Sequence, residues 1–264
     1  SASRYFLTDN ITIGSWTPIC PEGFNGILDG KNFTLTDINI VQDNTDNIGI
    51  FSKISSTGIV TNLVLDVTSI RGKDNVGALA GVLEGSVINV TVTADDAVAV
   101  HITGSGINTG GIAGLLKGTA KNVIADGINI VGKERVGGLF GSIYGGKIGT
   151  SRSDGDIKGE SHVGGLSGSL DDGGRISSSF SKADVSGLST VGGLSGSVGA
   201  FSDATMSKSE IRYSYNLGDV SGTDSTGISI GGVVGYNTFH GEIYNAYSLG
   251  DTSSAGENVG GIAG

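Results

Sequence analysis

Four aspartates recur at one position of a repeating pattern, each just before a β-branched residue. They are Asp156, Asp184, Asp219 and Asp251, and Asn129 takes the same position one repeat earlier. Successive rungs of a parallel strand stack are about 4.8 Å apart, so these carboxylates would repel one another. Bound Ca²⁺, which prefers oxygen ligands, would relieve the repulsion. We favour the alternative of a solvent-facing row screened by water and salt, because the dense acidic spacing of calcium loops is missing. We therefore expect no cofactor, with Ca²⁺ as the alternative.

A recurring six-residue glycine motif defines the elements that must position this row. Its clearest copies read VGGLFG at 136–141 and VGGLSG at 163–168 and 191–196. Eight copies, the first of them degenerate, end at residues 52, 81, 114, 141, 168, 196, 235 and 264. Such self-similarity is the signature of a solenoid, in which each repeat packs on its neighbours.

The residues between the glycine motifs favour short strands over helices. They are rich in Val, Ile, Ser and Thr, and interior glycines would cost a helix up to about 1 kcal/mol each. Glycine would also permit sharp corners, because it adopts positive φ cheaply. The sequence therefore predicts an all-β fold, a right-handed parallel β-solenoid (β-helix). Two buried columns are expected, one of Val76, Val136, Val163, Val191 and Val259 and one of Leu79, Ile112, Leu139, Leu166, Leu194 and Ile262.

Residues 1–46 precede the first glycine motif and differ from the repeats. They hold Trp16, both prolines and the single cysteine, Cys20. Apolar residues alternate with polar ones around residues 5–13 and 33–40, which indicates strands. A solenoid needs an atypical first rung to cover its exposed end. We therefore expect an N-terminal cap over residues 1–46 and solenoid repeats over residues 47–264.

The composition excludes several classes of function. The net charge of −10, from 16 basic and 26 acidic residues, argues against nucleic acid and against anionic membranes as partners. No run of about 18 apolar residues is present, so we expect no membrane insertion. One cysteine rules out an internal disulfide framework. The chain begins at Ser1 without Met and stops at the end of a motif, which is typical of a segment of a longer protein.

Two further columns are predicted to be structural. Lys147, Arg175, Glu210 and Glu242 occupy one repeat position, so Arg175 should meet Glu210 on the next coil. Such an exposed pair contributes about 0–1 kcal/mol. A second column should stack side-chain amides along the solenoid axis. Its members are Asn62, Asn89 and Asn122, continued by Thr150 and Ser178.

The motifs resemble the GLUG repeat, named for Gly-Leu-any-Gly and found here at 138–141, 165–168 and 193–196. Segments 214–222 and 246–251 are similar to the stretch between GLUG motifs, and residues 5–8, 16–19 and 24–30 resemble its usual lead-in. The resemblance implies a large bacterial surface or secreted protein, such as a filamentous-haemagglutinin-like adhesin or an immunoglobulin-A-specific metallopeptidase. The peptidases' HExxH zinc motif does not occur in this sequence, so peptidase activity would lie outside it.

No pattern in the sequence predicts an active site. Glycoside hydrolysis needs two facing carboxylates at a defined separation, whereas Asp95-Asp96 and Asp171-Asp172 are adjacent pairs typical of polar corner loops. We therefore expect that the chain is not an enzyme. We expect a non-catalytic stalk or binding module of a large bacterial adhesin, located outside the cell or on the cell surface. The alternatives are an accessory repeat segment of a secreted IgA-type metallopeptidase and a carbohydrate-active β-helix.

Recognition is expected in the longest insertion, residues 199–209, together with residues 223–229. Loops on a rigid scaffold are where binding residues concentrate. The predicted binding residues are Phe201, Asp203, Met206 and Lys208. In the alternative interpretation Phe201 and Met206 fold back to cover a coil edge, because large apolar residues are usually buried. The expected partner is a host or matrix surface protein or a glycan.

Overall fold

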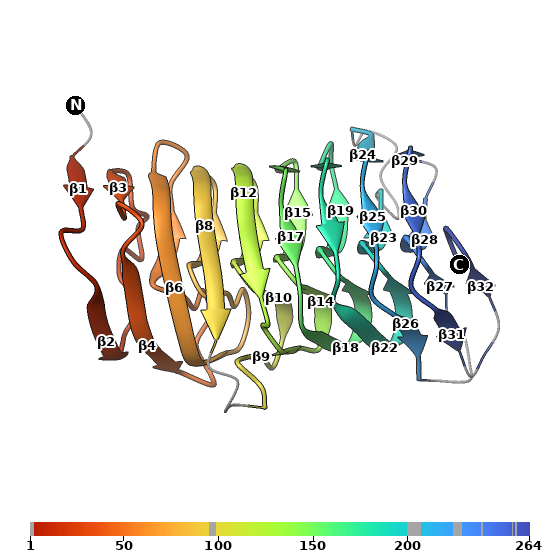
Figure 1. The fold of residues 1–264 in the computed structure, drawn as a ribbon, viewed down its shortest axis with the longest axis horizontal. Coiled ribbons are helices and arrows are strands. Elements are labelled where there is room, and N and C mark those ends of the chain that lie inside the picture. The colour runs from red at the N-terminus through yellow and green to blue at the C-terminus, as the bar shows by residue number, and fades with distance from the viewer. Residues whose placement is uncertain are drawn as a thin grey trace.

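The computed structural model describes residues 3–94, 99–199, 207–223, 229–238, 240–254, 256 and 258–264. These residues form strands and no helix, and every strand pair among them is parallel. The strands belong to a large sheet of 25 strands and a small sheet of seven. Equivalent strands of successive coils lie side by side from the N-terminal to the C-terminal end (Figure 1). The predicted all-β parallel β-solenoid is confirmed.

The first part of the large sheet is built from two series of strands separated by a corner. The first series is β1 (Arg4–Phe6), β3 (Ile27–Asp29), β6 (Ile59–Gly72), β8 (Ser86–Ala94), β12 (Thr119–Asp126), β16 (Lys147–Gly149), β20 (Arg175–Ser177), β24 (Ser209–Arg212) and β29 (Gly241–Tyr244). The second is β2 (Ile11–Ser15), β4 (Thr34–Val41), β17 (Arg152–Ser153), β21 (Phe180–Ser181), β25 (Tyr215–Asn216) and β30 (Tyr247–Ser248). The long strands β6, β8 and β12 run through both series.

The second part of the large sheet follows in each coil. Its strands are β9 (Ile102–Gly104), β13 (Ile130–Val131), β18 (Asp156–Gly164), β22 (Asp184–Gly192), β26 (Val220–Gly222) and β31 (Thr252–Ser254), then β10 (Ile107–Gly110), β14 (Glu134–Gly137), β27 (Ile230–Gly231) and β32 (Val259–Gly260). The small sheet completes each coil with β5 (Phe51–Ile54), β7 (Ala80–Leu83), β11 (Ala113–Leu116), β15 (Phe140–Tyr144), β19 (Ser167–Asp171), β23 (Ser195–Val198) and β28 (Val234–Asn237).

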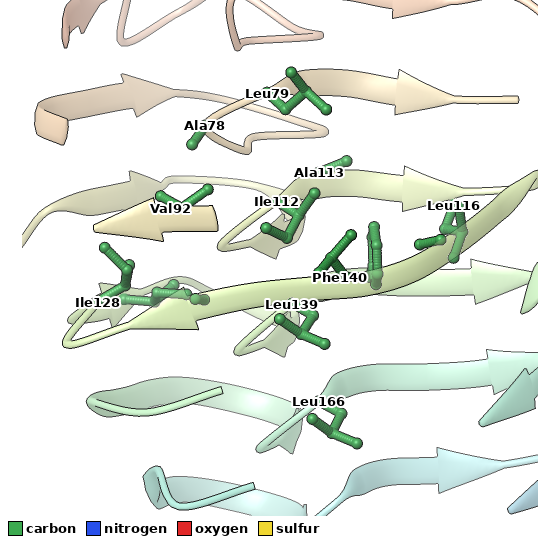
Figure 2. Close-up of a cluster of buried hydrophobic side chains, with 14 of the residues drawn as sticks. Ala78, Leu79, Val92, Ile112, Ala113, Leu116, Ile128, Leu139, Phe140 and Leu166 are labelled. Atoms are coloured by element: carbon green, nitrogen blue, oxygen red, sulfur yellow. The ribbon is translucent and has the colours of Figure 1, made fainter. Parts of the chain in front are cut away.

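The apolar columns form the core inside the coils. Figure 2 shows Leu79, Ile112, Leu139 and Leu166 at equivalent places in successive coils, and all four are fully buried. The predicted valine column is likewise buried at Val76, Val136, Val163 and Val191. The prediction was wrong for Val259 and Ile262, which are 46% and 44% exposed because they lie in the last described coil, with no described coil beyond it.

The segment predicted as a cap is joined to the repeats by the same hydrogen-bonded ladder. Strand β1 pairs with β3 and β3 with β6, while β2 pairs with β4 and β4 with β6. An isolated parallel bridge joins Ile19 to Phe51 of the small sheet. The boundary after residue 46 therefore marks only where the glycine motifs begin, because the pairing of strands continues across it.

The predicted asparagine column is confirmed at the corner between the two first series. Asn89 Nδ2 donates to Asn62 Oδ1 at 3.0 Å, and Asn122 Nδ2 donates to Asn89 Oδ1 at 2.9 Å. Asn62, Asn89 and Asn122 have φ angles of 52°, 54° and 52°. This is the left-handed conformation, which asparagine tolerates well. Thr150 and Ser178 continue the corner with φ of 53° and 49°.

A second corner column precedes the glycine motif and explains its last glycine. Asn75 Nδ2 donates to Asn47 Oδ1 at 2.9 Å, and Asn108 continues the column with a bond of 2.8 Å. A Cβ on Gly168 would lie 2.4 Å from the Arg135 carbonyl carbon of this corner, so only glycine permits the approach. The described motif glycines do not adopt positive φ, contrary to our expectation, because residues such as Arg135 and His162 make the left-handed turn instead.

Candidate functional site

The predicted aspartate row forms one column in the large sheet. Asp156 pairs with Asp184 in the strand register, and the pairing of Val185 with Val220 keeps Asp219 in line with them. The backbone N–H of Asp219 donates to Asp184 Oδ1 at 2.9 Å, and the N–H of Asp251 donates to Asp219 Oδ1 at 2.9 Å. One coil earlier, Asn129 Oδ1 accepts from the N–H of Asp156 at 2.9 Å. These side chains connect successive coils.

The row therefore has a hydrogen-bonding role that its spacing alone did not predict. Lys158 Nζ also lies 3.3 Å from Asp156 Oδ2 and balances that carboxylate. Among the described residues, no group of three or more His, Cys, Asp or Glu side chains is arranged to hold a metal ion. Calcium binding by this row stays the alternative to the favoured solvent-facing row.

Only one of the four predicted binding residues falls within the described chain. Phe201, Asp203 and Met206 lie outside the described residues, whereas Lys208 is described and exposed. Its ammonium forms an ion pair with Glu242, which also accepts a hydrogen bond of 2.7 Å from the Tyr244 hydroxyl. The hydrogen bond with Lys208 holds the pKa of Glu242 below its usual value. Lys208 is thereby connected to the following coil.

The predicted charge column is confirmed at its centre. Arg175 pairs with Glu210 in register, and their Nε and Oε2 atoms are 2.8 Å apart. Both side chains are largely covered, at 35% and 23% exposure. The pair therefore supports the register between two coils.

An outward-facing aromatic column was missed in the sequence. The rings of Phe180 and Tyr215 stack with centroids 5.0 Å apart and planes at 2°, and Tyr215 stacks on Tyr247 at 5.2 Å and 6°. The signal was present, since each ring lies four residues before an aspartate of the row. Because the rings cover one another's faces, this column stabilises the stack, with each aromatic pair contributing about 0.5–1.5 kcal/mol.

A small polar pocket lies where four strands of neighbouring coils meet. Its volume is about 160 Å³, and it is lined by Arg135 of β14, His162 of β18, Ser169 and Asp171 of β19, and Ser197 of β23. Ser169 Oγ donates to Ser142 Oγ at 2.9 Å. Ser197 is fully buried, and its hydroxyl has no hydrogen-bond partner among the described residues. A buried hydroxyl without a hydrogen-bond partner costs about 1–3 kcal/mol of folding free energy, so its presence here calls for an explanation.

Burial perturbs both titratable side chains of this polar pocket. Burial, assisted by the nearby Arg135 charge, lowers the pKa of His162, and Glu134 partly opposes that effect. Burial raises the pKa of the Asp171 carboxyl, against a hydrogen bond with Ser169. The sequence indicated only a polar corner loop at Asp171-Asp172, but Asp171 ends strand β19 and lines the pocket. Perturbed groups in a concavity mark a candidate site.

A second, apolar pocket of about 420 Å³ lies in the first coils. It is lined by Tyr5, Leu7, Ile11, Ile13, Trp16, Ile19, Cys20, Phe24, Leu28, Leu35, Ile50 and Phe51. The Trp16 indole Nε1 donates to the Ile50 carbonyl at 3.1 Å, which fixes one wall. The pocket continues the solenoid core toward the first coil, and its lining offers little hydrogen bonding.

Comparison with known proteins gives one sequence relative and one structural neighbour. No family model matches the chain, so the GLUG assignment stays a prediction. Halomucin of Haloquadratum walsbyi is 36% identical over 103 residues, which cover 34% of this chain and 1% of halomucin. A crystal structure of a Bacteroides ovatus protein assigned as an immunoglobulin A1 protease matches 98% of this chain and 78% of that one, with a TM-score of 0.55 and 18% identity. That likeness shows the fold.

The chain thus spans about 1% of the length of the relative that it matches. Within the described residues, no helix is long and apolar enough to cross a membrane.

Proposed function

We propose that this chain is a non-catalytic stalk and binding module of a large bacterial adhesin, at the cell surface or secreted. The observation that carries the proposal is the stack of parallel strands from β1 to β32, whose register shifts at a bulge between β4 and β6, with its buried apolar columns and its side-chain ladders. Such a stack is a rigid scaffold whose exposed corners can present recognition residues. The match to a short part of halomucin supports a place within a much larger protein.

The state of the carboxylates supports a non-catalytic role. Hydrolysis of a glycoside needs one protonated acid and one free carboxylate on opposite sides of the scissile bond. The aspartate row instead lies along one column, and Asp184 and Asp219 each accept a backbone amide of the next coil. These side chains are engaged in holding coils together.

An accessory segment of a secreted IgA-type metallopeptidase is the second candidate. The fold likeness to the Bacteroides ovatus protein favours it. In that case the chain would bind or position immunoglobulin A, and hydrolysis would occur elsewhere in the parent protein. A carbohydrate-active β-helix is the third candidate.

One experiment separates these candidates. The intact chain is passed over immobilised mucin-type glycoprotein and over immobilised immunoglobulin A, and the recovered ligands are examined by mass spectrometry. The adhesin proposal predicts saturable binding to the glycoprotein with both ligands intact. Binding confined to immunoglobulin A favours the accessory segment, and shortened glycans would show a carbohydrate-active enzyme. Saturable binding to neither surface contradicts the adhesin proposal.

A further inference from the structure

We infer that the polar pocket lined by Arg135, His162, Ser169, Asp171 and Ser197 binds one sugar residue of an uncharged saccharide. This inference rests on the proposed function, because it locates glycan recognition by the binding module and names its ligand class. It moves recognition from the insertion at 199–209 to the junction of β14, β18, β19 and β23.

The polar groups of this pocket match a ligand that both donates and accepts hydrogen bonds. Arg135 offers donors only, Asp171 offers carboxyl oxygens, and the serine hydroxyls can do either. The buried Ser197 hydroxyl lacks a partner among the described residues, so a bound hydroxyl group would satisfy it. The pocket volume of about 160 Å³ is roughly ten times the about 10–15 Å³ that a cavity needs to hold one water, room for much of one sugar ring.

The charges around the pocket disfavour an anion. The Arg135 guanidinium lies 3.4 Å from a Glu134 carboxylate oxygen, which offsets its charge. Asp171 lines the pocket and Asp172 follows it, while the chain as a whole carries −10. A phosphate or carboxylate ligand would meet these acidic groups, whereas a neutral polyhydroxyl compound would not.

Two half-exposed tyrosines flank the pocket. Tyr144 is directly opposite Asp171 in the register of β15 and β19, and Tyr236 is directly opposite Ser197 in that of β23 and β28. They are 40% and 42% exposed. Neighbouring strands are about 4.8 Å apart, so each ring lies within reach of a ligand in the pocket. Aromatic surface beside a few convergent polar groups is the usual make-up of a small-molecule site.

The test uses the intact chain, isotope-labelled for NMR, with methyl glycosides of glucose, galactose, mannose and N-acetylglucosamine as probes. At least one probe should shift the amide signals of residues 169–171 and 197 saturably. Asp171→Asn, which keeps the side chain's shape, should raise the dissociation constant about tenfold or more, the loss expected for a hydrogen bond to a charged group. Asp37→Asn is the matched control, because Asp37 lies on β4 in the first coils and also has a side-chain partner, Thr68. It should leave binding unchanged.

Other outcomes overturn the inference. Inorganic phosphate or acetate shifting the same signals while no glycoside does would make the pocket an anion site. Unchanged affinity in both Asp171→Asn and Arg135→Gln, with both variants folded by their melting curves, would place the glycosides elsewhere. Saturable binding to the mucin-type glycoprotein that survives in both variants would overturn the inference while leaving the adhesin proposal intact. If the unaltered chain does not bind the glycoprotein at all, that result would instead contradict the proposed function.

Discussion

The backbone N–H of Asp219 donates to Oδ1 of Asp184 on the preceding coil at 2.9 Å. The same bond links Asp251 to Asp219. A row of acidic residues that suggested a metal site therefore connects coils through their backbones. By accepting these hydrogen bonds, which are charge-assisted, the Asp184 and Asp219 carboxylates offset their repulsion from the next aspartate of the row.

A substitution that removes the acceptor oxygen of Asp184 should destabilise the stack of coils, whereas a substitution that keeps this oxygen should not. Asp184→Ala leaves the Asp219 N–H without its partner and should lower the free energy of unfolding by about 1 kcal/mol. Asp184→Asn keeps Oδ1 and should change it little. Urea denaturation of both variants measures the difference. Equal losses would mean that the bond between Asp184 and Asp219 contributes nothing.

Calcium should leave the melting temperature unchanged. Asp184 and Asp219 each use one oxygen for a backbone amide, so the row offers few oxygens to one ion. Anything that binds only the folded state raises its stability by mass action. Thermal melts in millimolar calcium and in chelator should therefore coincide. A reproducible rise in the melting temperature when calcium is added would establish a metal site at Asp156, Asp184, Asp219 and Asp251.

Truncating a core leucine should be costly in this tightly packed core. Leu166 is fully buried, so Leu166→Ala should cost roughly 2–5 kcal/mol in the free energy of unfolding. Leu188 is 44% exposed on β22, and Leu188→Ala should cost less than about 0.5 kcal/mol. Chemical denaturation compares the two variants. Similar, small losses would contradict the assignment of Leu166 to the core.

Most of the fold could be predicted from the repeat, because residues at the same position within each repeat lie one above another even where the interval between repeats varies. Columns such as Asn62, Asn89 and Asn122 follow directly from the period, and so does the pair of Arg175 with Glu210. The role of the motif glycines was harder to predict. Sequence shows where glycine recurs, but only the packed coils show that Gly168 is needed for contact with the Arg135 backbone.

The polar pocket could not be predicted from the period, because its members come from different repeat positions. Arg135 and His162 replace asparagines of a corner column, whereas Ser169 and Ser197 replace the larger Val82 and Leu115 of the small sheet. The pocket arises where small residues in one column meet long polar ones in another. Each column by itself looks like an ordinary variation of the repeat.

The His162 ring should titrate below its usual pKa of 6.5. Burial is the main cause and Arg135 adds to it, while Glu134 opposes them and Ser161 lies 3.4 Å from Nδ1. Because the pKa of His162 is lower in the folded state, the contribution of His162 to the free energy of unfolding is fully present above pH 6.5. It is lost as the pH falls through the folded-state pKa. NMR titration of the ring measures this pKa. Arg135→Gln should raise it while leaving it below 6.5, and a wild-type value at or above 6.5 would contradict the burial of the ring.

Adhesion under flow tests whether the chain binds a cell surface. Beads coated with the intact chain are passed over a layer of glycan-bearing host cells, and attached beads are counted with increasing soluble chain as competitor. Coated beads should attach far more than albumin-coated beads, soluble chain should abolish attachment, and the cell-surface glycoproteins should remain intact. Attachment no greater than that of albumin-coated beads would contradict a binding module.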